Sequence, residues 1–267
     1  MSSILPESVK KGFTDGQNYD SNRPEYTDEA TDEVIRMLGI PHNCDGDKTC
    51  KIVELGAGTG KFTRKITNQL RSRKGVTFVA TEPMTELLTV LQKSCPSVQT
   101  LQCATENISM ETSSVQGIIA AQSFHWFSNK KALDEIHRVL SDSGNLVLLW
   151  NFNDRNVDWI NQVHAQIDNL RTDPYQYHGL KWKTAIDTHS GFQFIEQKIT
   201  QGTIIQGTVE DILKHCSTHS SLQKLEASQR TEELDKIRTI LNTHNETKGK
   251  DFIQLPFYTD IYLYRKV

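Results

Sequence analysis

Apolar residues along the chain follow two spacings in turn, and this pattern predicts alternating strands and helices. Short apolar runs typical of buried strands occupy residues 51–55, 76–80, 98–103, 115–121, 145–150, 192–199 and 259–265. Helical spacing occupies residues 28–38, 62–70, 84–92, 130–140, 157–170, 208–215 and 231–241. Strands that alternate with helices of this length favour an α/β fold, in which a parallel sheet is covered by helices on both faces.

The chain changes character after residue 150, where helices outnumber strands. The extra helices are not needed to close the sheet, so we expect them to form a cap over the carboxyl ends of the strands. A length of 267 residues lies near the upper limit of one globular domain. We therefore predict a single domain, with a core at 28–150 and with sheet completion and cap helices at 151–267.

Charge and composition exclude several classes of partner. The 33 acids are interspersed with 30 lysines and arginines, whereas a nucleic-acid groove normally shows a basic excess. No apolar run approaches the ~20 residues of a membrane-spanning helix. The first residues lack an apolar targeting segment, and the five cysteines and nine histidines show no metal-ligand spacing. We expect a cytoplasmic protein with no metal, no membrane and no nucleic-acid partner.

Glycines follow the first predicted strand in an E-x-G-x-G-x-G pattern formed by Glu54, Gly56, Gly58 and Gly60. Glycines at a strand-to-helix turn let a ligand approach the backbone closely, and the next helix offers free N–H groups. A dinucleotide fingerprint would need its third glycine at position 61, where the chain has Lys61. Glu54 would repel a pyrophosphate but suits a ligand that carries an ammonium group.

A second acid, Glu82, ends the next predicted strand. An acid at this position accepts two hydrogen bonds from ribose hydroxyls in nucleotide-binding sheets. The glycines, Glu54 and Glu82 together therefore predict a site for a nucleoside with an ammonium group. The alternative is a tight turn flanked by two surface acids.

Nearly the full chain resembles class I S-adenosylmethionine-dependent methyltransferases, and within them the trans-aconitate methyltransferase-like group (methyltransferase type 11) of small-molecule enzymes. Besides the glycine loop, the resemblance rests on the motifs at residues 19–26, 80–84, 104–108, 120–127, 217–220 and 255–260. It implies a Rossmann-like seven-stranded, mostly parallel sheet whose last strand lies antiparallel between strands five and six. It also implies S-adenosyl-L-methionine as the cofactor.

The resemblance further implies which residues contact the cofactor. Residues 1–27 would form a lid segment in which Tyr19 and Arg23 cover the cofactor, with Arg23 binding the carboxylate of its methionine part or of the substrate. Residues after the third strand would contact adenine, Thr105 being the preferred polar contact. The expected cofactor-binding residues are Tyr19, Arg23, Glu54, Gly56, Ala57, Gly58, Gly60, Glu82, Pro83, Met84, Ala104, Thr105, Glu106 and Gln122.

An aromatic run beginning after Gln122 follows the fourth strand, where a ligand meets the sheet edge. An apolar wall suits methyl transfer from a sulfonium, because charge is dispersed during the reaction. His125 and Tyr19 are the candidate catalytic residues; His125 would act as a general base or, as we prefer, contact cofactor or substrate. The expected substrate contacts are Trp126, Trp150 and Asn151.

The identity of the methyl acceptor is less constrained. The D/N-P-P-Y/F motif of amide and base N-methyltransferases is replaced by Ala121-Gln122-Ser123-Phe124. The resemblance favours a carboxylate oxygen on a small molecule, while amine, hydroxyl and thiol acceptors stay open. A protein that binds S-adenosylmethionine without catalysis is the alternative from another class. The sequence does not indicate the oligomeric state.

Overall fold

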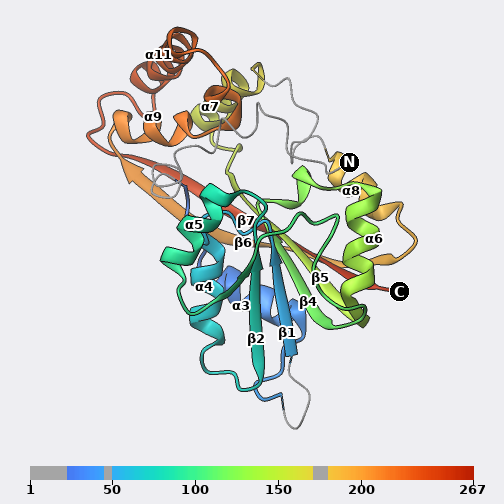
Figure 1. Ribbon diagram of the computed structural model, residues 1–267. Helices are drawn as coiled ribbons and strands as arrows, with labels where there is room; N and C mark the ends of the chain where they lie inside the picture. The colour runs from blue at the N-terminus through green and yellow to red at the C-terminus, as the bar shows by residue number, and fades with distance from the viewer. Residues whose placement is uncertain (1–22, 45–49, 171–179) are drawn as a thin grey trace.

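The computed structural model describes residues 23–44, 50–170 and 180–267. They form a seven-stranded sheet with the strand order β3-β2-β1-β4-β5-β7-β6 (Figure 1). The strands are β1 (Cys50–Leu55), β2 (Val76–Thr81), β3 (Gln99–Leu101), β4 (Val115–Ala121), β5 (Leu140–Asn153), β6 (Phe192–Gly207) and β7 (Ile253–Lys266). Pairing from β3 to β5 is parallel, and β7 runs antiparallel to both β5 and β6. The Rossmann-like sheet with one antiparallel strand is therefore confirmed.

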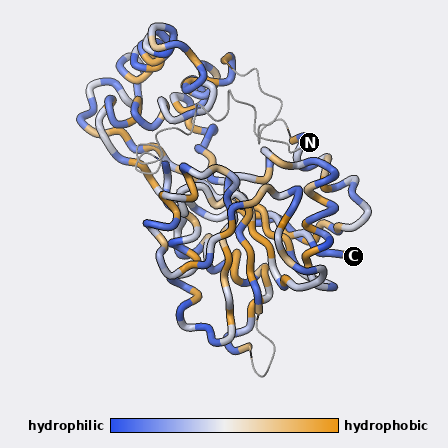
Figure 2. Tube along the Cα trace, in the orientation of Figure 1, coloured by the Kyte–Doolittle hydropathy of each residue, from blue (hydrophilic) through white to orange (hydrophobic). Residues whose placement is uncertain are grey.

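Helices cover both faces of the sheet because its strands are apolar on both sides. In β4, Ile118 packs in the core of one face, and its neighbour Ile119 packs in the core of the other. Figure 2 shows the hydrophobic residues gathered along these central strands. One face is covered by α3 (Asp28–Leu38), α4 (Lys61–Leu70) and α5 (Thr85–Ser94), and the other by α6 (Lys130–Val139) and α8 (Lys181–Asp187).

Local capping sets the ends of the helices that precede the site. The Thr27 hydroxyl accepts a hydrogen bond from the Ala30 N–H at 3.2 Å, and α3 ends at Gly39 in the left-handed conformation. A capping box between Thr208 and Asp211 begins α9 (Val209–Ser217). These local hydrogen bonds satisfy backbone N–H groups at the first turn of both helices.

A helical cap stands over the carboxyl ends of the strands, as expected. The strands β6 and β7 are longer than predicted, and the paired segments near Gly207 and Ile253 support the cap. The helices α7 (Asp158–Asp168), α9 and α11 (Ala227–Thr243), with the short α10 (Ser220–Gln223), lie together at the top of Figure 1. Buried residues such as Ile212, Ile237 and Leu255 give the cap its own apolar core.

One helix of the region expected to form the cap lies elsewhere. The helix α8 packs against the sheet, where Trp182 is buried with Trp150 and Phe124. The cap therefore takes α7 from this region but not α8. The proposed lid segment falls largely within residues 1–22, outside the described residues. In the described ranges, no helix has both the length and the apolar character needed to cross a membrane.

Candidate active site

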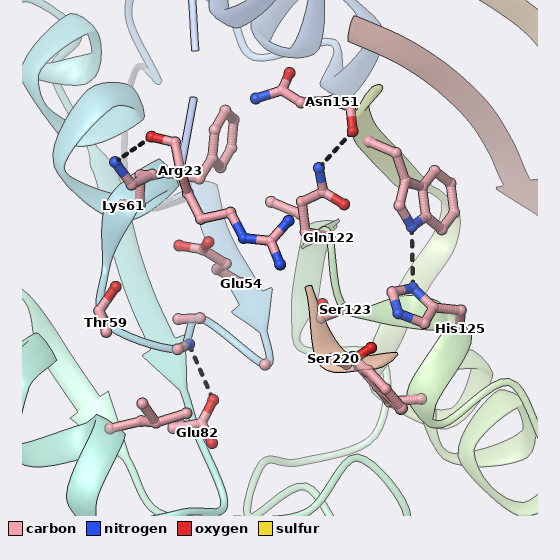
Figure 3. A pocket seen from close by; sticks show the side chains of 18 of the residues that line it. Arg23, Glu54, Thr59, Lys61, Glu82, Gln122, Ser123, His125, Asn151 and Ser220 are labelled. Atoms are coloured by element: carbon pink, nitrogen blue, oxygen red, sulfur yellow. Dashed lines mark hydrogen bonds between the residues drawn. The ribbon is translucent and has the colours of Figure 1, made fainter. Parts of the chain in front are cut away.

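A cavity of about 890 Å³ lies between the carboxyl ends of the central strands and the cap. Its walls come from the glycine loop after β1, the ends of β2, β4 and β5, and the cap helices α7, α9 and α10. Small-molecule sites usually span about 300–1,000 Å³, so this cavity has room for a cofactor and a small second ligand. Figure 3 shows Glu54 and Glu82 on the glycine-loop side, with His125 on the opposite side.

The glycines of the loop have two different roles. Gly58 has a φ of +59° and lines the cavity, and a Cβ there would meet no atom within 4 Å. Gly60 has a φ of +86°, but a Cβ there would lie 2.5 Å from Leu91 Cδ1 in α5. Gly58 therefore leaves its space to a ligand, whereas Gly60 permits close packing of the turn on α5.

Glu54 lies at the end of β1 with only 1% of its surface exposed. Its Oε2 accepts a hydrogen bond from the Thr63 hydroxyl at 2.5 Å. Burial raises the pKa of Glu54 to about 8, and nearby Glu82 adds to the increase while the Thr63 bond opposes it. A cation placed in the cavity beside this carboxyl group would stabilise its charged form.

Glu82 follows β2 and is held by the backbone. Its two carboxylate oxygens accept hydrogen bonds from the N–H of Gly58 at 2.9 Å and of Met84 at 3.0 Å. Burial raises the pKa of Glu82, and these two bonds oppose the shift. Each oxygen has a second lone pair, so the carboxylate still has capacity to accept hydroxyl groups of a ligand.

Arg23 joins the glycine-loop side of the cavity to the cap. Its Nη2 donates to the Thr218 carbonyl at 2.7 Å, and its own carbonyl accepts from Lys61 Nζ at 3.1 Å. Lys61 also pairs with Glu25 at 2.6 Å. The start of the described chain is thereby tied to the glycine loop and to the segment after α9.

The opposite wall begins where β4 ends. Gln122 has a φ of +57°, which is uncommon for a residue with a side chain, and its Nε2 donates to the Asn151 carbonyl at 2.9 Å. The Ser123 hydroxyl donates to the Leu55 carbonyl at 2.7 Å and so connects this turn to β1. In the following 3₁₀ turn η2 (Phe124–Trp126), His125 Nδ1 lies 3.1 Å from Trp150 Nε1.

A family model described as a methyltransferase domain matches residues 53–148, from the glycine-loop strand into β5. An uncharacterized methyltransferase-like protein of Schizosaccharomyces pombe is 32% identical over 251 residues, covering 94% of this chain and 93% of that protein. The chain is a class I S-adenosylmethionine-dependent methyltransferase. S-adenosyl-L-methionine is accordingly its cofactor.

Other relatives of this methyltransferase agree with the assignment. An uncharacterized methyltransferase of Mycobacterium tuberculosis is 27% identical over 241 residues, covering 90% of this chain and 89% of that protein. Among solved structures, the YcgJ protein of Bacillus subtilis matches with a TM-score of 0.55 at 16% identity, covering 90% of this chain and 99% of that one. The [4+2]-cyclase SpnF matches with a TM-score of 0.54 at 14% identity, covering 99% of each chain. At these identities the structural matches show the fold alone.

The cavity of the methyltransferase brings together most of the residues predicted to form the site. Gly60 is not in the lining, and Tyr19 lies outside the described residues. The predicted residues that line the cavity are Arg23, Glu54, Gly56, Ala57, Gly58, Glu82, Pro83, Met84, Ala104, Thr105, Glu106, Gln122, His125, Trp126, Trp150 and Asn151. Their individual roles toward cofactor and substrate stay predictions.

Sequence reasoning missed the contribution of the cap to this cavity. Three cap histidines line it: His164 in α7, His215 in α9 and His219 just before α10. The ring centroids of His164 and His215 lie 5.7 and 5.8 Å from that of His219. Asn153, the last residue of β5, and Arg155, two residues later, line the same wall. Asn153, Arg155 and His164 are far in the sequence from His215 and His219, and no motif joins the two groups. Among the described residues, no cluster of three or more His, Cys, Asp or Glu side chains could bind a metal ion.

Proposed function

We propose that this methyltransferase transfers the methyl group of S-adenosylmethionine to a carboxylate oxygen of a small-molecule acid. The observation that carries the proposal is the separation of charge within the cavity. All four acids among the described lining residues lie outside the cap, in β1 or in the segments after β2 and β3: Glu54, Glu82, Glu86 and Glu106. The cap wall has cationic and hydrogen-bond-donating side chains and no acid among its described lining residues.

The acidic side fits the cofactor. Glu82 would accept the ribose hydroxyls, Glu54 would face the ammonium group, and the open space above Gly58 would admit the ligand. Ala104, Thr105 and Glu106 would contact the adenine. The ammonium group would offset the repulsion between the two buried carboxylates, because it favours the charged form of Glu54.

The cap wall fits an acid. His164 Nε2 donates to the Asn153 Oδ1 at 2.7 Å, because an amide oxygen only accepts. Asn153 Nδ2 is buried and has no hydrogen-bond partner in the part of the chain that the structure describes. Buried donors are normally satisfied, so an oxygen of a bound acid would complete this network. Arg155 is 2.8 Å from Asp168, which orients its guanidinium beside the cavity.

A carboxylate acceptor also matches what the chain can do chemically. When bound, S-adenosylmethionine supplies an electrophilic methyl group on a sulfonium sulfur. A carboxylate is already ionised at neutral pH and needs no general base. The chain therefore has to orient the acceptor and exclude water, and the aromatic wall formed by Trp126, Phe127 and Phe152 contributes to both.

The decisive experiment uses S-adenosylmethionine with a labelled methyl group and a panel of small carboxylic acids, amines, phenols and thiols. We expect label in the acids, and we expect mild base to release it as methanol, because methyl esters hydrolyse whereas N-methyl and S-methyl groups do not. Accumulation of base-stable label in an amine, phenol or thiol would refute the carboxylate proposal.

The substitution Asn153→Asp tests the role of the cap wall with almost no change in shape. A negative charge at this position should raise the KM of an acid about 10-fold or more by like-charge repulsion, while S-adenosylhomocysteine binding stays unchanged. Asn161→Asp is the matched control, because Asn161 is exposed on α7 and does not line the cavity. Equal KM values for the two variants would show that the acceptor does not contact the cap wall.

A further inference from the structure

The indole of Trp150 and the imidazole of His125 form a hydrogen bond on the wall of the cavity. Trp150 Nε1 lies 3.1 Å from His125 Nδ1, marked by a dashed line in Figure 3. An indole nitrogen carries a hydrogen and has no lone pair to offer, so Trp150 is the donor and Nδ1 is the acceptor. In the neutral ring the proton must then be on Nε2.

This tautomer limits what His125 can do. A general base needs an unprotonated nitrogen with an available lone pair, and the only such nitrogen of this tautomer, Nδ1, accepts from Trp150. The other nitrogen, Nε2, carries a hydrogen and can donate it. The side chain lines the cavity, so the geometry favours a donor on this wall and opposes the general-base role considered for His125.

Trp150 itself is held firmly enough to impose the tautomer. Only 1% of its surface is exposed, and it lies on β5 between strands. Its ring lies 4.3 Å from the ring of Trp182 in α8 and 6.0 Å from that of Tyr262 in β7, centroid to centroid. Close packing against these two rings restricts rotation of the indole, so its N–H is directed at His125.

We propose that His125 donates a hydrogen bond from Nε2–H to the acceptor and that Trp150 is the positioning residue that sets the tautomer. The role toward the acceptor rests on the proposed function. With a carboxylate acceptor, the bond is made to the oxygen that does not attack, and it orients the other oxygen toward the methyl group. Since no proton leaves the acceptor, a donor serves this reaction and a base does not.

The tautomer can be measured without turnover by NMR of the full chain carrying ¹⁵N-labelled histidine, with His125 assigned by comparison with His125→Asn. We expect a protonated Nε2 and an unprotonated Nδ1 in the wild type. Trp150→Phe keeps an aromatic ring but removes the donor, so the Nδ1–H form should appear beside the Nε2–H form. Trp159→Phe is the matched control: Trp159 is buried in the cap core and does not line the cavity, so the tautomer of His125 should not change.

Two amide substitutions separate a donor from a base in the reaction. The amide nitrogen of His125→Gln can reach the position of Nε2, whereas the amide of His125→Asn reaches only that of Nδ1. We expect kcat/KM for a carboxylic acid to fall about 10- to 100-fold in His125→Asn, the loss of one hydrogen bond to a charged group, and several-fold less in His125→Gln. Binding of S-adenosylhomocysteine, measured by calorimetry, should stay the same in both variants.

The outcomes distinguish this inference from the proposed function. A proton on Nδ1 in the wild type, or the same tautomer in wild type and Trp150→Phe, would overturn the positioning role. Equal loss of activity in His125→Gln and His125→Asn would overturn the donor role. If no carboxylic acid accepts label while the tautomer is as expected, the proposed acceptor is wrong and the role of Trp150 stands.

Discussion

Replacing the buried Glu54 with glutamine should remove a large pH dependence of stability. In the folded protein without cofactor, the pKa of Glu54 is raised from 4.5 to about 8, mainly by burial. Between these two values the folded chain keeps a proton that the unfolded chain releases. The free energy of unfolding therefore falls as the pH rises through this interval.

The magnitude follows from the size of the shift. Each unit of pKa difference corresponds to about 1.4 kcal/mol, so the contribution of Glu54 should change by about 3 kcal/mol between pH 5.5 and 8. Glutamine is neutral throughout this range, and its amide oxygen can still accept the hydrogen bond that Thr63 donates to Glu54. The free energy of unfolding of the variant minus that of the wild type should therefore be about 3 kcal/mol larger at pH 8 than at pH 5.5.

Urea unfolding of the cofactor-free proteins at four pH values from 5.5 to 8 measures this difference. Subtracting the variant from the wild type cancels the titration of groups that do not interact with Glu54. Glu106→Gln is a suitable control, because Glu106 lines the same cavity but is only partly buried. A difference between wild type and Glu54→Gln that does not vary with pH would show that Glu54 is ionised in the folded protein.

Three further predictions follow from the same structure. Gly60→Ala, which has a positive φ and would place a Cβ 2.5 Å from Leu91, should lower the free energy of unfolding by about 2–4 kcal/mol. Gly58→Ala should lower it by only about 1–2 kcal/mol but should weaken S-adenosylhomocysteine binding. Urea unfolding measures the stability of both variants, and calorimetry measures their binding. Glu82→Ala should weaken S-adenosylhomocysteine binding by about 2–4 kcal/mol in calorimetry, and unchanged affinity would place the ribose elsewhere. Ile237→Ala, in the cap core, should lower the free energy of unfolding by about 2–5 kcal/mol, and a smaller loss in urea unfolding would mean that the cap repacks around the gap.

The cofactor side of the cavity was predictable because its signals are local. Glu54 lies at the end of one buried strand and the glycines follow it, while Glu82 follows the next strand. The carboxyl ends of parallel strands meet at one edge of a sheet, so recognising the strands was enough to bring these residues together. The fold followed for the same reason, since strand and helix spacing can be read from neighbouring residues.

Element lengths were less predictable where pairing depends on distant partners. The strand expected at 145–150 extends over Leu140–Asn153, and the strand expected at 259–265 extends over Ile253–Lys266. Residues 151–153 of β5 pair with β7, and the added residues of β7 pair with β5 or β6. Several of these residues are polar, so they carry no apolar signal of their own. Conversely, β3 is only Gln99–Leu101, because the residues after it turn toward the cavity.

The chain's residue order alone identifies a nucleoside-binding sheet and the acids that suit a sulfonium cofactor, because those signals lie within a few residues of each strand end. Tertiary structure was needed to bring His164 in α7 to the same wall as His215 and His219, and to direct the Trp150 indole at His125. Both features join residues with no fixed spacing along the chain. Their geometry is set by how the cap and α8 pack on the sheet, and packing of this kind leaves no local pattern in the sequence.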